Sequence, residues 1–320
     1  MQLAKQVIEQ ELKSFETHFS KSVKTNNALL DRIMKFLIKR KGKQMRPMFV
    51  FLSARIIGNT QERTYRAAAL IELLHTASLV HDDVVDDSNL RRGFFSINAL
   101  WKNKVAVLLG DYLLAKGLLL SVEHQDFEIL KIVSTAVKEM SEGELLQIEK
   151  ARKLDIKEAV YFEIIRSKTA SLLAAACAAG AWSVNEDFES TERMRLFGEK
   201  LGICFQIKDD LFDYGFENVG KPTGNDIKEK KMTLPLIYTL SQVDESLKRK
   251  LIYIVKNQSQ QKDKVDEVIQ IVKQYGGIEF ATKKMYEYQK EALDILYTFP
   301  ESEARKGMEE LVFHVTKRTF

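Results

Sequence analysis

The chain has 320 residues, 45% of them hydrophobic, and a formal net charge of +4. This length is enough for a large buried core. No segment has a higher density of basic residues than an ordinary solvated surface, which argues against nucleic-acid binding. Two cysteines are too few for a disulfide framework, and the first ten residues lack a signal-peptide core. We therefore expect a cytoplasmic protein.

Helical periodicity, with apolar residues three and four positions apart, runs along the chain. Apolar stripes open it around Ile8 and Ile33. Further helices are expected at about 65–87, 104–122, 127–150, 157–182, 190–214 and 232–241, and several more between 244 and 319.

Strand-like alternation is nearly absent, and no segment rich in Gly, Ser or Pro divides the chain. The longest weakly polar run, 171–182, is too short and too rich in alanine to span a bilayer. We predict an all-α, large single-domain helical bundle over residues 1–320.

Two short acidic motifs interrupt apolar, helix-like stretches, and both read Asp-Asp-x-x-Asp, at 82–86 and 209–213. Residues three and four apart share one face of a helix, so each motif crowds its carboxylates together, which destabilises a bare helix. Mg²⁺ suits such oxygen ligands, because it binds one or two carboxylates and completes its shell with water and substrate phosphates. The candidate metal ligands are Asp82, Asp83, Asp86, Asp209, Asp210 and Asp213.

Basic residues accompany these motifs. Lys43 and Arg46 lie on a short turn that opens a helix, which is either a phosphate site or a solvated basic turn. Arg91 and Arg92 follow the first motif and could bind a phosphate or simply neutralise the carboxylates. Lys168 interrupts an apolar helix, where it needs a partner or extends to solvent.

Three further features lie near the acidic motifs. His75 precedes Asp82 by two helical turns on roughly the same face, although a lone histidine is also an ordinary core residue. Gln206 lies three residues before Asp209. The segment 215–226 has three glycines and a proline, which suggests a lid, with lysines at 221 and 231.

Together these segments resemble the trans-isoprenyl diphosphate synthases, the polyprenyl synthetase family. The resemblance covers nearly the whole chain. Two acidic motifs, with RRG after the first and KMTLP after the second, are far more specific than one such motif. The matching segments are GKQMRP (42–47), LLHTASLVHDDVVDDSNLRRG (73–93), GDYLLAKG (110–117), EGELLQ (142–147), KTA (168–170) and FQIKDDLFDYGFENVGKPTGNDIKEKKMTLP (205–235).

The resemblance implies an isoprenoid synthase bundle with a central active-site cavity. It implies head-to-tail condensation of an allylic diphosphate, such as farnesyl or geranyl diphosphate, with isopentenyl diphosphate. About three Mg²⁺ ions, the usual number in the family, would hold the allylic diphosphate. Their ligands would be Asp82, Asp86 and Asp209. Asp83, Asp210 and Asp213 would be further ligands or would support the first three. A homodimer that hands its product to membrane enzymes would also fit the family.

The resemblance also assigns the remaining polar residues. Arg91, Lys168, Lys221 and Lys231 would contact the allylic diphosphate, and Gly42, Lys43, Arg46, His75 and Arg92 would bind isopentenyl diphosphate. Lys168, Thr169 and Gln206 would be the catalytic residues, the last two near the reacting carbons.

The helix before the first motif predicts product length. Ser78 and Leu74 continue the ridge of Asp82 and Asp86, and short-chain members carry bulky rings at the level of Ala77 and Ser78. Both residues are small here, a feature that would also suit close helix packing. One turn rises about 5.4 Å, near one isoprene unit, so we predict a product of about six to eight units. Leu74, Leu70 or the 127–140 helix would form the next floor.

Other functions stay open. A shorter-chain farnesyl or geranylgeranyl diphosphate synthase shares the motifs, and a terpene cyclase shares the fold but usually lacks the basic site around Lys43. A metal phosphohydrolase, suggested by His81-Asp82, would need more histidines at helical spacing. The catalytic subunit of a two-component synthase would keep both motifs.

Overall fold

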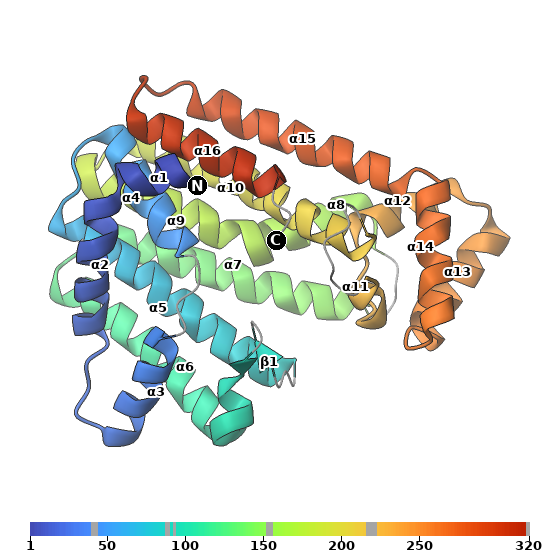
Figure 1. Ribbon diagram of the computed structural model, residues 1–320, viewed down its shortest axis with the longest axis horizontal. Helices are drawn as coiled ribbons and strands as arrows, with labels where there is room; N and C mark the ends of the chain where they lie inside the picture. The colour runs from blue at the N-terminus through green and yellow to red at the C-terminus, as the bar shows by residue number, and fades with distance from the viewer. Residues whose placement is uncertain (40–43, 87–89, 92–93, 152–155, 216–222, 318–320) are drawn as a thin grey trace. The chain divides into compact units, whose positions relative to one another are not determined.

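The computed structural model describes residues 1–39, 44–86, 90–91, 94–151, 156–215 and 223–317. Within this part of the chain nearly every element is a helix (Figure 1). The described strands are two residues long each, β1 (Leu90–Arg91) and β2 (Phe94–Phe95), and they pair antiparallel.

The chain divides into two compact units, each assembled from three chain segments. The first comprises Met1–Val137, Ala175–Arg195 and Phe299–Met308, and the second Lys138–Ala174, Leu196–Thr298 and Glu309–Phe320. The first acidic motif belongs to the first unit and the second motif to the second. The single domain expected from the sequence remains a prediction.

The first unit contains the early helices. They are α1 (Gln2–Val7), α2 (Glu9–Ser22), α3 (Ala28–Lys39), α4 (Met45–Ile57), α5 (Glu62–Val85), α6 (Ile97–Glu123) and the start of α7 (Phe127–Ala151). It also takes the later part of α9 (Ser171–Asn185), the first residues of α10 (Phe188–Asp213) and the start of α16 (Glu303–Lys317).

The second unit contains the remaining parts of these four helices and the late helices. These are α8 (Glu158–Ile165), the π-helix η1 (Arg166–Ala170), α11 (Asn225–Lys228), α12 (Leu234–Gln242), α13 (Glu245–Asn257), α14 (Lys262–Gln274) and α15 (Gly277–Leu296). Helices α13 and α14 lie side by side (Figure 1) and bury their apolar faces, as their hydrophobic period predicts.

Helices α5 and α6 form the longest packed pair of the first unit. A Cβ at Gly110 of α6 would overlap the imidazole of His81, and one at Gly117 would lie 2.9 Å from Leu70 Cδ1. Positions therefore rise on α6 as they fall on α5, so the pair is antiparallel. Two glycines seven residues apart share a face of α6 and let the helices approach closely.

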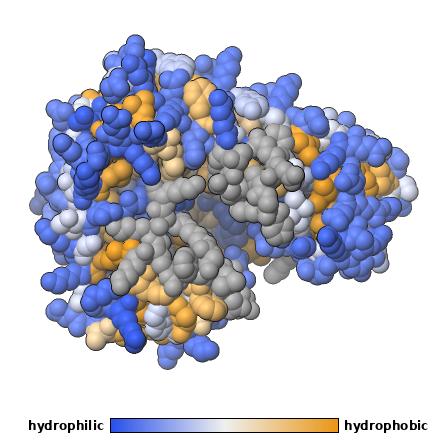
Figure 2. All heavy atoms as spheres, in the orientation of Figure 1, coloured by the Kyte–Doolittle hydropathy of each residue, from blue (hydrophilic) through white to orange (hydrophobic). Residues whose placement is uncertain are grey.

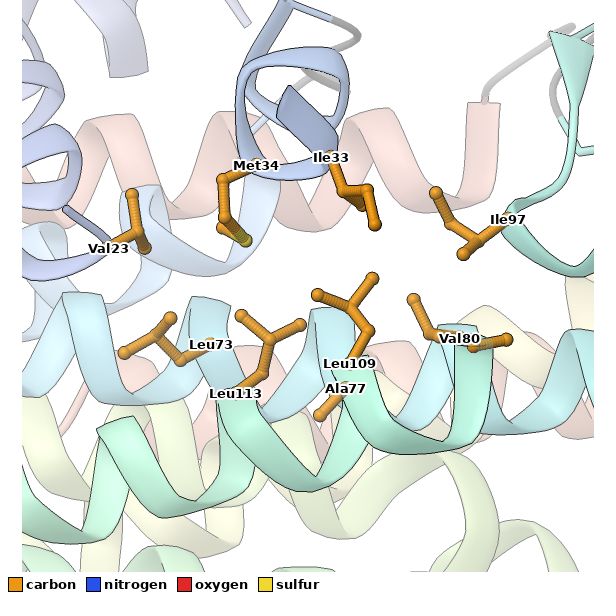
Figure 3. Close-up of a cluster of buried hydrophobic side chains, with 10 residues drawn as sticks. Val23, Ile33, Met34, Leu73, Ala77, Val80, Ile97, Leu109 and Leu113 are labelled. Atoms are coloured by element: carbon orange, nitrogen blue, oxygen red, sulfur yellow. The ribbon is translucent and has the colours of Figure 1, made fainter. Parts of the chain in front are cut away.

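An apolar cluster joins this pair to α3. Figure 3 shows Ile33 and Met34 of α3 opposite Ala77 of α5, with Leu109 and Leu113 of α6 beside it. All five side chains are buried. On α5 the cluster includes Ala77 and Val80, which directly precede the first acidic motif. The packing of this cluster therefore holds the end of α5 that carries the motif in place within the first unit.

The helical prediction is confirmed, with two local differences. The stretch 157–182 is interrupted by η1, and α6 begins at Ile97 rather than near residue 104, with a non-helical backbone at Lys102. The weakly polar run 171–182 lies within α9. Among the described residues, α6 alone is long and apolar enough to cross a membrane, a property that core helices of soluble proteins share. Hydrophilic residues dominate the face drawn in Figure 2, with apolar ones in separate patches.

Candidate active site

The first acidic motif occupies the C-terminal end of α5. Asp82 and Asp83 lie in the last turn, and Asp86 follows the helix as its C-cap. Asp83 is buried, Asp82 is half-buried and Asp86 is exposed. A helix C-terminus carries partial negative charge, so carboxylates there are unfavourable until a cation joins them. The spacing therefore favours a cation at Asp82 and Asp86.

Residues of α6 hold this end of α5 in place. The Asn98 side-chain amide donates to the Asp83 carbonyl oxygen at 3.1 Å. The His81 ring rests on the α6 backbone, with Nε2 3.2 Å from the Val107 carbonyl oxygen. The same nitrogen lies 3.5 Å from Asp111 Oδ1, so His81 is held against α6 by two groups of that helix.

Asp210 of the second motif is a buried acceptor in the second unit. Its Oδ2 accepts hydrogen bonds from the Tyr161 hydroxyl at 2.7 Å and the Leu234 amide at 3.5 Å, and its Oδ1 accepts one from Gln206 Nε2 at 3.0 Å. Burial raises the pKa of Asp210 to about 7, and the charge of Asp226 adds to the effect. Donors from the protein occupy both oxygens, which suits a supporting role.

Asp213 has a different task at the end of α10. Its carboxylate accepts hydrogen bonds from the Asn225 amide at 2.6 Å and the Asp226 amide at 3.1 Å, and so caps the start of α11. Burial and the nearby Asp226 raise the pKa of Asp213 to about 6. Asp209, by contrast, is half-buried on another face of α10.

The donor set of both motifs fits Mg²⁺. The carboxylate oxygens are hard ligands, and each motif offers the one or two that this ion takes from a protein. Within the described ranges, no group of three or more His, Cys, Asp or Glu side chains is arranged to hold a metal alone. An ion that completes its shell with substrate phosphates does not need such a cage.

The π-helix η1 presents Lys168 and Thr169 to different helices. Lys168 is ion-paired with Glu144 of α7 and donates to Gln147 Oε1 at 3.2 Å. The Thr169 hydroxyl donates to Gln206 Oε1 at 2.9 Å, so a continuous chain of hydrogen bonds runs from Thr169 to Asp210. A π-turn is often found at a functional site.

The structure describes some of the other predicted residues and leaves the rest outside the described ranges. Lys231 is paired with Glu229 at 2.5 Å and lies 3.8 Å from Asp226. Arg46 lies in the first turn of α4, and His75 is buried in α5, both in the first unit. Gly42, Lys43, Arg92, Lys221 and residues 216–222 of the expected lid lie outside the described residues, as does the side chain of Arg91.

The three residues predicted to set product length have different surroundings. Ala77 lies in the apolar cluster of Figure 3. The Ser78 hydroxyl donates to the His75 carbonyl oxygen at 2.9 Å, and Leu74 lies against the Gly117 position of α6. Ile33 and Met34 of α3 lie on the opposite side of this cluster, a neighbourhood that the sequence did not suggest.

The sequence also missed Tyr161, Glu144, Gln147 and Asp226. Glu144 and Gln147 lie in the quoted EGELLQ segment, and their spacing of three on a helix was a usable signal. Tyr161 carried no local signal, because its partner Asp210 is distant in sequence.

We expect Tyr161→Phe to lower the free energy of unfolding by about 1.5–3 kcal/mol, because a buried carboxylate loses a donor. Urea denaturation followed by circular dichroism measures this difference. Tyr253→Phe is the matched control, since Tyr253 is exposed on α13. Equal stability losses in the two variants would contradict the supporting role of Tyr161.

Comparison with known proteins agrees with this geometry. The sequence model described as polyprenyl synthetase matches residues 27–272, more than half of the chain. The chain belongs to the polyprenyl synthetase family. An all-trans-nonaprenyl-diphosphate synthase (geranyl-diphosphate specific) of Rhodobacter capsulatus is 36% identical over 309 residues, which are 95% of this chain and 94% of that protein.

Two further relatives show the range of this family. Heptaprenyl diphosphate synthase component 2 of Geobacillus stearothermophilus is 34% identical over 312 residues, 97% of this chain and 96% of the relative. The crystal structure of a geranylgeranyl pyrophosphate synthase from Bacteroides thetaiotaomicron is 41% identical with a TM-score of 0.84, and the match covers 99% of this chain and 98% of that one. The polyprenyl synthetase fold is thus the fold of the whole chain.

Proposed function

We propose that the chain is a Mg²⁺-dependent prenyltransferase. It condenses farnesyl or geranyl diphosphate with isopentenyl diphosphate, head to tail, into a polyprenyl diphosphate of about six to eight isoprene units. The observation that carries this proposal is the pair of Asp-Asp-x-x-Asp motifs, each at the C-terminal end of a long helix in a member of the polyprenyl synthetase family.

Asp82, Asp86 and Asp209 are the proposed ligands for about three Mg²⁺ ions. When bound, the metal neutralises the diphosphate that leaves the allylic carbon. Asp83, Asp210 and Asp213 are buried and support these ligands. The hydrogen bonds that Asp210 and Asp213 accept from protein donors support this division of roles.

Lys168 and Lys231, with Lys221 and Arg91, bind the leaving diphosphate in this proposal. Ionisation leaves an allylic cation, which needs apolar walls and a few oriented dipoles, with no strong nucleophile nearby. The Thr169 hydroxyl is oriented by its bond to Gln206, and Gln206 by its bond to Asp210. The departing diphosphate takes the final proton.

Arg46 and His75, with Gly42, Lys43 and Arg92, bind isopentenyl diphosphate in this proposal. Arg46 lies in the first turn of α4, where backbone amides and a guanidinium together favour an anion. His75 lies in the first unit too, two turns before Asp82.

Incubation with farnesyl diphosphate, isopentenyl diphosphate and Mg²⁺, followed by chromatography of the dephosphorylated products, tests the function. We expect products of about six to eight units, because a turn of helix without bulky rings admits more than one further unit. A shorter-chain synthase is the second candidate, favoured by the likeness to the geranylgeranyl pyrophosphate synthase structure. Release of inorganic phosphate without prenyl transfer would refute both candidates.

A homodimer in the cytoplasm, whose product passes to membrane enzymes, completes the proposal. Helix α6 leaves apolar side chains exposed, with Leu108 at 60% and Leu119 at 53%, and a second copy would cover them. The chain has a mass of 36.8 kDa, so light scattering is expected to give twice that mass. A monomer that gains activity only with a second protein would instead indicate a two-component enzyme.

A further inference from the structure

Lys168 has a carboxylate partner in this structure. Its ammonium is ion-paired with Glu144 and also donates to Gln147, which lies one turn further along α7. The pair is shielded, because the Lys168 and Glu144 side chains are only 35% and 28% exposed. Such a pair is stronger than one in open solvent.

Local backbone packing places Glu144 at this point. A Cβ at the preceding residue, Gly143, would lie 2.8 Å from Ser167 Cβ and 2.9 Å from the Lys168 backbone nitrogen. Only glycine allows α7 to come so close to η1. The next residue along α7 therefore carries its carboxylate to the side chain of Lys168.

We propose that Glu144 is a positioning residue that acts as a releasable counter-ion for Lys168. It holds the ammonium in the ligand-free enzyme, yields it to an incoming diphosphate and takes it back when inorganic diphosphate leaves. This inference rests on the proposed role of Lys168 in binding diphosphate.

The negative charge of Glu144 remains at the site when a diphosphate binds. Lysine is a compact charge on a flexible stem, so its ammonium can move between two anions that lie close together. A diphosphate must first separate the ion pair and then lie near the carboxylate of Glu144. Both effects weaken diphosphate binding. Because one inorganic diphosphate leaves at every condensation, a synthase that adds many units gains from faster release.

The test measures the Kd of inorganic diphosphate with Mg²⁺ by isothermal titration calorimetry. We expect Glu144→Gln to lower the Kd about fivefold or more, because it removes one negative charge near the anion and keeps the side-chain shape. Glu142→Gln is the matched control. Glu142 lies on the same helix, is 61% exposed and pairs with Lys138 at 3.6 Å, so its Kd is expected to stay near that of the wild type.

A double-mutant cycle with Lys168→Gln distinguishes two explanations. Glu144 could act by holding Lys168, or it could simply repel the diphosphate by its own negative charge. If Glu144 acts by holding Lys168, the tightening caused by Glu144→Gln becomes smaller when Lys168 is absent. An unchanged or higher Kd in Glu144→Gln, equal tightening in Glu142→Gln, or the same tightening in both backgrounds would overturn the inference. Thermal unfolding of all four variants checks that they are folded.

Two different results would contradict the role of Lys168 and the proposed function. If the wild-type enzyme forms prenyl products but Lys168→Gln binds diphosphate as tightly as the wild type, the role of Lys168 is wrong and the counter-ion fails with it. If the wild type forms no prenyl product at all, the proposed function itself fails.

Discussion

Asp82→Ala and Asp209→Ala are each expected to lower kcat by at least roughly 10²-fold, the size of effect seen when one strong electrostatic stabiliser is lost. The leaving diphosphate develops its charge in the transition state, and the metal held by these carboxylates would stabilise that charge. Steady-state kinetics at saturating substrates, and at a Mg²⁺ concentration that just saturates the wild type, measure the loss. Asp82 and Asp209 belong to different units, so the two variants test the two motifs separately.

Asp266→Ala is the control for these variants, because Asp266 is an exposed carboxylate on α14. Its kcat is expected to stay near the wild-type value. Excess Mg²⁺ should recover part of the lost activity if the substituted residue is a ligand, since weaker binding is offset by concentration. Near-normal turnover in either Asp82→Ala or Asp209→Ala would refute the assignment of that residue to the metal.

Ala77→Phe is expected to shorten the products to about three or four isoprene units, because the added ring closes the path less than two turns below Asp82. Ala77 is fully buried in the apolar cluster of Figure 3, which has Ile33 and Met34 of α3 on its opposite side. A close-packed core has little room for a phenyl ring, so the ring is forced toward whatever space the growing chain uses. Chromatography of dephosphorylated products gives the length distribution.

Loss of stability must be separated from blockage of the path. Overpacking costs about 1–3 kcal/mol, and Ala68→Phe introduces the same ring at another buried position of α5. That control is expected to lose stability without changing product length. Ser78→Phe, on the adjacent face of α5, should shorten the products as Ala77→Phe does. If a folded Ala77→Phe enzyme still makes the wild-type length, the growing chain runs elsewhere.

The helices of this protein and the places of its acidic motifs can be predicted from the local pattern of residues in the sequence. The helices of both units follow the apolar period of the sequence, since a helix needs only one consistent face to be buried. The positions of the two acidic motifs at helix ends were equally readable, because spacing on a helix is a local property. The family resemblance then supplied the chemistry that we propose for the carboxylates and lysines at those positions.

The tertiary structure decided what non-local contacts control. Asp209, Asp210 and Asp213 look alike in sequence, yet Asp210 accepts a hydrogen bond from Tyr161 and Asp213 accepts one from the start of α11. The π-turn at Lys168 was hidden in a stretch that reads as one continuous helix, and Gly143 of another helix packs against it there. Helix propensity describes each segment alone. Whether a polar side chain faces a ligand or a partner depends on which backbone approaches it, and close approach is a property of the packed chain.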